Sequence, residues 1–498
     1  MAEYYKFQPF NVKPRVFIIS DISNEPDDAE SLVRYLLYAN ELETRGLVAC
    51  TSTHIRNKTC PEDMEAIVRG YAQVADNLNV HVHPDSPFPP AQTLLAMIRS
   101  GPAMYGKAAL EPSVPLSGGT VLLIDEIDKS LDPLWVLCWG GTNVLAQALH
   151  HVHKSRSPED CQIFRSKIRV YAISDQDDTG LWIRTTFPDI FYICSIHGWS
   201  QYSHATWTGI SSEADKGGSD SSKITRAWLR ENIQIGPFGQ CYPDHKFLIE
   251  GDTPTFLYLI QNGLGSPEHP EWGSWGGRYD LIDPGMAAKH WSDTVDTVEG
   301  KDGNWYTSNY ATVWRWRDAF QNDFAARMQW TMTKDVSRAN HAPLVCVNGN
   351  GYSPDSLVLE VEAGQKVVLD ASRSYDPDGD VLSFHWFLYK EVSITTGLIA
   401  MPQQIPHIQM DNVDPVVPDR KVEISLPPPE LCAIEPLSGN PVEKGQVFHF
   451  ILQVKDNGTP CLTTYKRVII QTTNSQLKGK RGFAVDTTAE WLELEHRG

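Results

Sequence analysis

Acidic side chains crowd a short segment near the start of the chain. Residues 21–28 read DISNEPDD, and the acids among them are Asp21, Glu25, Asp27 and Asp28. One carboxylate suffices to cap a helix, whereas several at this density repel one another unless a cation or the hydroxyls of a sugar neutralise them. The segment therefore predicts a binding or catalytic site. The competing interpretation is a capping cluster at a helix N-terminus, where the helix dipole favours negative charge.

A second acidic run and a histidine lie further along the chain. Residues 175–178 read DQDD, and an acid such as Asp177 is a candidate general acid, with Asp178 as a candidate substrate ligand. The structural alternative is that Asp178 caps the next helix. His197 is a candidate proton donor to a leaving group, although most lone histidines are not catalytic. Trp199, two residues later, is a candidate stacking surface for a sugar.

The elements that must position these residues alternate between strands and helices. Short apolar runs predict strands at 15–20, 46–52, 134–139, 168–173 and 190–194, and helical spacing predicts helices at 27–38, 62–76 and 143–152. Such alternation predicts an α/β fold with a mostly parallel sheet and helices on both faces. Ligands of these folds bind at the carboxyl ends of the strands, which is where both acidic runs lie.

The pattern changes twice in the second half of the chain. Residues 265–310 are rich in Gly, Trp and Pro, which predicts a long ordered loop region, with Trp275 as a candidate substrate-binding residue. A helix to about residue 333 follows. Beyond residue 337 the apolar pattern has period two, with turn clusters between strands, which predicts an all-β sandwich. The expected domains are therefore 1–337 and 338–475, followed by a tail at 476–498.

The first acidic segment resembles a known family fingerprint. It is similar to the nucleoside hydrolase pattern D-x-D-P-G-x-D-D, with Asp21, Asp27 and Asp28 at its first, third and fourth acids and Ser23 at its second. It resembles more closely the nucleoside hydrolase-like branch described through cellulose-binding bacterial proteins, which typically reads D-I-x-x-[DE]-P-D-D-x-x-S-L-V-R and also carries a C-terminal β-sandwich. Further similar segments are WGGTN at 139–143, ISDQDD at 173–178, GDTPTFLYLI at 251–260 and SWGGRY at 274–279.

The resemblance implies a calcium-dependent hydrolase and a set of site residues. The implied Ca²⁺ ligands are Asp28, Asp252, the carbonyl of Thr142 and Asp21. The implied substrate ligands are Asp27 and Asp252, to which we add Asn24 and Asn143. Because Ser23 replaces the family's catalytic base, Asp21 or Glu25 is expected to take that role. Thr142 and Asp252 also have the simpler interpretation of helix caps.

A second departure from the family bears on the substrate. Gly251 stands where nucleoside hydrolases carry a histidine that helps the base to leave. We therefore expect a glycosidase that acts on a furanosyl or oligosaccharide O-glycoside, by attack of a metal-positioned water. One alternative is a non-catalytic protein that binds cellulose or another polysaccharide. The other is a true N-ribosyl nucleoside hydrolase.

Composition narrows the classes of partner. The 498 residues carry a formal net charge of −19, which disfavours nucleic acid and anionic membranes as partners and fits a carbohydrate or glycoside. No apolar run is long enough for a membrane helix. The first residues lack the features of a signal peptide, which predicts a cytoplasmic protein, or a secreted one whose signal has been removed. Homo-oligomerisation stays open.

Overall fold

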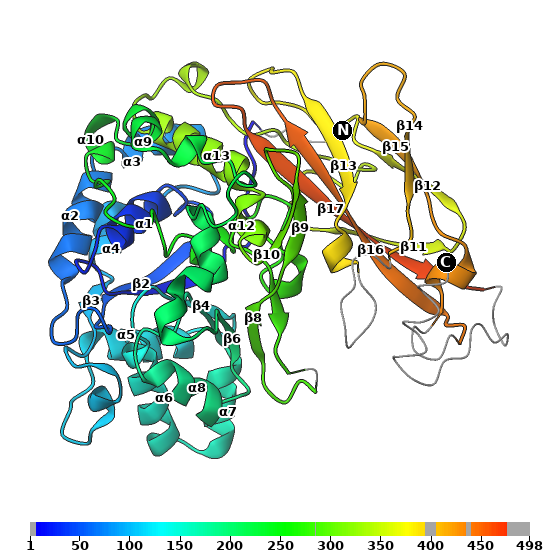
Figure 1. The fold of residues 1–498 in the computed structure, drawn as a ribbon. Helices are drawn as coiled ribbons and strands as arrows, with labels where there is room; N and C mark the ends of the chain where they lie inside the picture. The colour runs from blue at the N-terminus through cyan, green and yellow to red at the C-terminus, as the bar shows by residue number, and fades with distance from the viewer. Residues whose placement is uncertain (1–5, 284, 394–404, 435–439, 476–498) are drawn as a thin grey trace. The chain divides into compact units, whose positions relative to one another are not determined.

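The computed structural model describes residues 6–283, 285–393, 405–434 and 440–475 (Figure 1). The chain separates into two compact units. The α/β unit comprises Pro9–Gln261 and Gly265–Ala339, and the β-sandwich unit comprises Met1–Gln8, Asn262–Leu264 and Asn340–Gly498. The expected tail at 476–498 lies outside the described residues. Among those residues, no helix has both the length and the apolar character needed to cross a bilayer.

An eight-stranded sheet forms the centre of the α/β unit. Its strand order is β3-β2-β1-β4-β5-β6-β8-β7. All neighbouring strands pair in parallel except β7 and β8, which confirms the predicted mostly parallel sheet. The strands are β1 (Arg15–Ser20), β2 (Glu43–Ala49), β3 (Ile98–Ser100), β4 (Leu134–Cys138), β5 (Ile168–Ala172), β6 (Phe191–Cys194), β7 (Tyr279–Leu281) and β8 (His290–Asp293).

Both faces of this sheet are covered, because its central strands consist mainly of apolar residues. Every residue of β1 and of β4 is buried. On one face, Phe17 and Val136 join a core with Leu123, Leu145 and other residues of the flanking helices. The helices of the unit are α1 (Asp27–Leu36), α2 (Pro61–Tyr71), α3 (Ala75–Leu78), α4 (Ala91–Leu95), α5 (Gly118–Asp128), α6 (Asn143–Ser155), α7 (Pro158–Ser166), α8 (Thr179–Thr186), α9 (Arg226–Asn232), α10 (Gly236–Gly239), α11 (Pro254–Leu257), α12 (Ala311–Trp314) and α13 (Arg317–Trp330).

Aromatic packing covers the opposite face. The Tyr258 ring lies 5.4 Å from the Trp135 ring on β4 and 5.7 Å from the Tyr171 ring on β5. Phe256 on α11 lies 5.5 Å from the Tyr35 ring on α1. Helices therefore cover both faces, and the segment that follows Asp252 is tied to the sheet.

The region predicted as a long loop contains short strands in addition to turns. It holds β7 and β8 of the main sheet and a separate antiparallel hairpin of β9 (Asp296–Glu299) and β10 (Trp305–Ser308). Strands of three or four residues are too short for a periodic pattern to reveal. Their pairing partners, rather than their own sequences, define them.

Two β-sheets form the sandwich unit. One sheet has the order β11-β17-β16-β13 and the other β12-β15-β14. Their inner faces share one core, in which Leu369 and Ile424 of the second sheet meet Phe450 and Ile470 of the first. The strands are β11 (Leu357–Glu362), β12 (Lys366–Asp370), β13 (Ser383–Leu388), β14 (Gln409–Asn412), β15 (Lys421–Ser425), β16 (Lys444–Lys455) and β17 (Thr463–Thr473), with a short helix α14 (Pro429–Cys432).

Two strands that are close in sequence belong to different sheets of the sandwich. β11 and β12 are separated by only three residues, yet β11 pairs with β17 and β12 with β15. Gly364 lies between them with a φ of +80°, a conformation that L side chains rarely adopt. The turn at this glycine lets the chain change sheets.

Candidate active site

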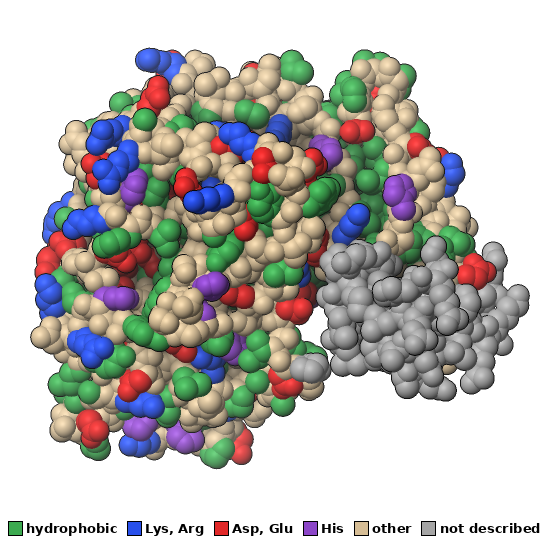
Figure 2. All heavy atoms as spheres, in the orientation of Figure 1, with side chains coloured by type: hydrophobic (Ala, Val, Ile, Leu, Met, Phe, Trp, Pro, Cys, Tyr) green, Lys and Arg blue, Asp and Glu red, His purple; other side chains and the backbone are tan. Residues whose placement is uncertain are grey.

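A pocket of about 300 Å³ lies at the carboxyl ends of the parallel strands. Residues that follow β1, β2, β4, β5 and β6 all contribute to it, as expected for a parallel sheet. On the face of the α/β unit shown in Figure 2, acidic, basic, histidine and hydrophobic side chains are interspersed. The pocket is lined by Asp21, Asn24, Glu25, Asp27, Asp28, His54, Trp139, Ile173, Gln176, Tyr202, Trp207, Phe247 and Leu248.

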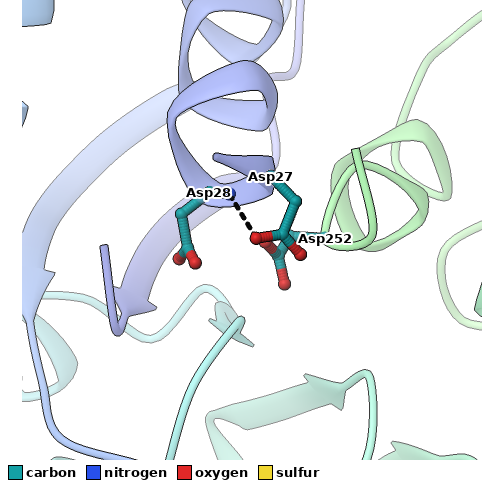
Figure 3. Close-up of side chains that lie close together, drawn as sticks. All are labelled: Asp27, Asp28 and Asp252. Atoms are coloured by element: carbon teal, nitrogen blue, oxygen red, sulfur yellow. Dashed lines mark hydrogen bonds between the residues drawn. The ribbon is translucent and has the colours of Figure 1, made fainter. Parts of the chain in front are cut away.

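Three carboxylates meet at the N-terminus of α1. Asp27 and Asp28 are the first residues of that helix, and Asp252 comes from the turn before α11 (Figure 3). One carboxylate oxygen from each lies within 4.8 Å of the others. The Asp28 N–H donates to Asp27 Oδ1 at 3.0 Å, and Ser20 at the end of β1 donates to Asp28 Oδ1 at 2.5 Å. The strand-to-helix turn thus fixes two of the acids, and the tertiary fold brings the third.

The third acid is buried without a partner. Asp252 is 1% exposed, and neither of its carboxylate oxygens has a hydrogen-bond partner among the described residues. Burial raises the pKa of Asp252 well above its usual range, and the neighbouring Asp28 and Asp27 raise it further. The pKa of Asp28 is raised for the same reasons. Buried carboxylates in such a group are costly unless a positive charge compensates them.

This set of oxygens fits a hard divalent cation. Ca²⁺ takes six to eight oxygen ligands, and the three carboxylates offer up to six. The Thr142 carbonyl accepts the Ala146 N–H at 2.9 Å, the first hydrogen bond of α6, and Thr142 is not among the residues that line the pocket. Of the expected calcium ligands, Asp21 and Asp28 line the pocket, Asp252 lies beside Asp28, and the Thr142 carbonyl caps helix α6.

Asp21 lies beside this group. It is 3% exposed, and its Oδ2 has no hydrogen-bond partner among the described residues. Burial raises its pKa to about 6. Gly140 makes room for it, because a Cβ at that position would lie 2.8 Å from Asp21 Oδ1. The glycine in the turn after β4 is therefore part of the site.

Ser23 is turned away from the acids. It is exposed, has a φ of +80°, and donates a hydrogen bond to Asp63 at the start of α2. The neighbouring Asn24 and Glu25 instead line the pocket. The side chain at the position of the family's second acid, Ser23, therefore lies outside the pocket, and the next two residues line the pocket instead.

The second acidic run does not form one cluster. Asp175 makes a two-pronged ion pair with Arg184, at 2.6 and 2.7 Å. Asp177 Oδ1 accepts the Thr179 N–H at 2.8 Å at the start of α8, while Asp178 is exposed and accepts the Lys107 N–H. The helix-capping contact thus belongs to Asp177 and not to Asp178. Among residues 175–178, only Gln176 lines the pocket.

His197 is held in a hydrogen-bonded chain. Its Nδ1 lies 2.9 Å from the Gly198 carbonyl, which can only accept, so Nδ1 carries the proton. Trp207 Nε1 donates to Ser174 Oγ at 3.1 Å, and this leaves the hydroxyl to donate to His197 Nε2 at 2.7 Å. Both ring nitrogens are therefore occupied. His197 supports Trp207 and is not among the pocket-lining residues, in contrast to its expected role as proton donor.

Three expected substrate ligands lie in different settings. Trp199 is 56% exposed and packs near the pocket residue Tyr202, with ring centroids 5.1 Å apart. Trp275 is 2% exposed and packs edge-on to Phe320, so its ring faces are covered and not available to a sugar. Asn143 is fully buried and donates to the Met104 carbonyl at 2.8 Å, so it holds a loop rather than lining the pocket.

Several lining residues were missed from the sequence. His54 comes shortly after β2. Its position beyond the carboxyl end of a strand, where ligands of parallel α/β folds bind, is a sequence signal that could have identified it. Trp207 lies in a short 3₁₀ helix (Thr206–Ile210) and Phe247 and Leu248 lie in a loop; none of these segments has a periodic pattern, and no sequence signal identifies the three residues.

Gly251 explains one departure from the nucleoside hydrolase pattern. A Cβ at this position would lie 3.0 Å from Asp27 Oδ2 and 3.0 Å from the Trp207 ring. Trp207 thus occupies space that a side chain at 251 would need. A tryptophan at 207 therefore requires a residue without a side chain at 251, and we call Gly251 and Trp207 a matched pair.

Comparison with known families places these features in context. Residues 15–279 match the family described as "Cellulose-binding Sde182, nucleoside hydrolase-like domain". Residues 366–472 match "Cellulose-binding protein Sde0182, C-terminal domain". No curated protein sequence matches the chain.

Two solved structures are similar to the chain. A nucleoside hydrolase-related hypothetical protein from Saccharophagus degradans, described as associated with carbohydrate metabolism, is 28% identical, with a TM-score of 0.73 over 93% of this chain and 100% of that chain. An inosine-uridine preferring nucleoside hydrolase from Bacillus anthracis is 14% identical over 64% of this chain and 100% of its own, with a TM-score of 0.32.

Proposed function

The chain belongs to the Sde182 nucleoside hydrolase-like family, and from this premise we propose that it hydrolyses glycosidic bonds of carbohydrates in the acidic pocket. The observation that carries the proposal is the convergence of buried carboxylates at the carboxyl edge of the sheet. Asp21, Asp27 and Asp28 line the cavity there, and Asp252, from a distant part of the chain, brings a carboxylate oxygen within 4.8 Å of those of Asp27 and Asp28. A structural role alone would not gather unneutralised acids at an open pocket.

The pocket acids bind the sugar and activate water, and Asp27 also contributes to a cation site. Asp27, at the helix N-terminus and on the pocket wall, accepts hydrogen bonds from sugar hydroxyls. Asp21 has an oxygen without a partner and a pKa raised to about 6, which suits a base that takes a proton from the attacking water near neutral pH. Glu25 lines the same pocket and is the alternative base. Water then loses a proton to the base and bonds to the anomeric carbon, while the bond from that carbon to the leaving oxygen breaks and the leaving oxygen takes up a proton from solvent.

Asp28 and Asp252, together with Asp27, would hold a divalent cation such as Ca²⁺. When bound, the cation supplies Lewis acidity that makes a nearby water easier to deprotonate. It also neutralises the carboxylates, which lets Asp252 stay ionised despite its burial. The chain itself orients these acids through Ser20 and the first turn of α1.

A second candidate function is carbohydrate binding without catalysis, as the name of the family suggests. The observation that favours it is Ser23, which stands where nucleoside hydrolases have their base and which faces Asp63 outside the pocket. If neither Asp21 nor Glu25 acts as base, the site binds sugar without cleaving it. Nucleoside cleavage is disfavoured, because Trp207 takes the space beside Gly251 where a base-protonating histidine would stand.

The test is release of sugar from a panel of nucleosides, aryl furanosides, aryl pyranosides and plant or fungal oligosaccharides, with calcium and with chelator. The variants are Asp21→Asn, Glu25→Gln and Asp28→Asn. Asp125→Asn, which makes the same change at an exposed position on α5, is the matched control. We expect calcium-dependent release by the wild type and the control, and a loss of about 100-fold or more in Asp21→Asn.

Each outcome decides between the candidates. Full activity in Asp21→Asn with loss in Glu25→Gln would transfer the base role to Glu25. Full activity in Asp28→Asn would refute the cation-assisted mechanism. Oligosaccharide binding without any release would favour the binding function.

A further inference from the structure

A group of aromatic side chains leads from the floor of the pocket to the protein surface. We call Trp207, Tyr202, His54 and Trp199 the aromatic wall. The Trp207 ring lies 6.4 Å from the Tyr202 ring, which lies 5.1 Å from Trp199 and 6.3 Å from His54. The His54 and Trp199 rings are stacked at 25° with centroids 6.4 Å apart. The four rings thus form a continuous series of ring contacts, most of them edge-to-face.

Exposure increases along this wall. Trp207 is 6% exposed and shares the pocket with the acids, Tyr202 is half-buried, and Trp199 is 56% exposed. Phe247, which lines the pocket as well, is 74% exposed. Large exposed aromatic side chains next to a pocket mark a surface that contacts a ligand. A ligand that begins at the acids and extends outward would pass over Trp199.

The wall is held in place by polar contacts. The chain from Trp207 through Ser174 to His197 fixes the inner ring, and His197 packs on Tyr202 with centroids 4.9 Å apart. Asp293 at the end of β8 accepts the Thr206 N–H at 3.2 Å and so fixes the turn that carries Trp207. Rings held this firmly offer a preorganised stacking surface, which lowers the entropic cost of binding.

We propose that the aromatic wall binds the sugar units that follow the scissile bond, so that the substrate is a neutral oligosaccharide rather than a nucleoside or a simple glycoside. This inference rests on the proposed function, because it takes the acidic floor as the place where the bond is cleaved. The C–H faces of sugar rings are apolar and pack on aromatic rings, while their hydroxyls stay in water or reach the carboxylates. The leaving group therefore lies over Tyr202 and Trp199.

The experiment measures binding by calorimetry for the full-length protein in calcium, on an Asp21→Asn background that suppresses turnover. The probes are glucose, cellobiose, cellotetraose and cellohexaose, with maltohexaose and inosine for comparison. The test variant is Trp199→Ala. The matched control is Trp305→Ala, since Trp305 is 68% exposed on β10 and does not line the pocket.

We expect the affinity to rise with chain length, and Trp199→Ala to weaken binding of the longer sugars by about tenfold while Trp305→Ala leaves it unchanged. An affinity independent of chain length, or equal behaviour of the two variants, would overturn the inference. Binding of inosine in preference to every sugar would also overturn it. The proposed function is judged separately, by calcium-dependent release of sugar in the wild type. Glycosidic cleavage together with no effect of Trp199→Ala on binding would refute only the proposed role of the aromatic wall.

Discussion

Addition of Ca²⁺ should stabilise the α/β unit, and loss of the Asp252 carboxylate should remove that stabilisation. Asp252 is buried with two unpartnered oxygens, and the strongest charges acting on it are the neighbouring carboxylates. A cation that binds there only in the folded protein adds RT ln(1 + [L]/Kd), which is about 2.7 kcal/mol at 100 times the Kd.

The expected shift in melting temperature follows from the size of the unit. About 330 residues at roughly 2.1 cal/mol/K each give an unfolding entropy of about 0.7 kcal/mol/K. A gain of 2.7 kcal/mol then raises the melting temperature by about 4 °C. If Asp252→Asn weakens cation binding about 100-fold, the same calcium concentration contributes about 0.4 kcal/mol, and the shift falls below about 1 °C.

The assay is differential scanning calorimetry of wild type, Asp252→Asn and the exposed control Asp125→Asn, each with chelator and then with calcium. In chelator we expect Asp252→Asn to be more stable than the wild type, because a buried carboxylate among like charges has been neutralised. Equal calcium shifts in wild type and Asp252→Asn would refute the assignment of the cation to this cluster. So would the absence of a shift in the wild type with Ca²⁺, Mg²⁺ and Mn²⁺ alike.

Three further predictions concern other parts of the molecule. Gly251→Ala places a Cβ 3.0 Å from the Trp207 ring and should lower the stability of the α/β unit by about 1–3 kcal/mol in urea denaturation, and an unchanged midpoint would contradict the matched-pair interpretation. Burial lowers the pKa of His290 from 6.5 to about 4, so below pH 6.5 the unfolded chain takes up a proton that the folded protein resists. The wild type therefore loses stability as the pH falls from 6.5 towards 4. The free energy of unfolding of His290→Asn, relative to that of the wild type, should rise by about 2 kcal/mol between pH 7 and pH 5. A difference that does not change with pH would argue against a buried neutral imidazole. Arg467→Met removes a buried donor to the Leu264 carbonyl at 2.8 Å. We expect the urea midpoint of the sandwich unit to fall by the equivalent of about 1–3 kcal/mol. A midpoint equal to that of the wild type would contradict this expectation.

The sequence by itself determined the main elements of the α/β unit. The apolar run at 15–20 became β1 with the same bounds, and the helix expected from residue 27 begins at Asp27. Buried parallel strands have a strong local signature, because both of their faces must be apolar. The family fingerprint from Asp21 to Arg34 likewise identified the acidic turn, because residues that are adjacent in the sequence on one turn are also close in space.

Only the tertiary structure decided which distant residues join that turn. It brings Asp252 to the acids and buries Trp275, although both lie in segments that resemble the family. It also turns Ser23 away from the pocket and occupies both nitrogens of His197. Burial and many hydrogen-bond partners depend on packing between segments that are separated in the sequence, such as Ser23 with Asp63 and Ser174 with His197, and local sequence carries little information about such contacts. Residue types thus indicated what chemistry was available, while packing selected the side chains that reach the pocket.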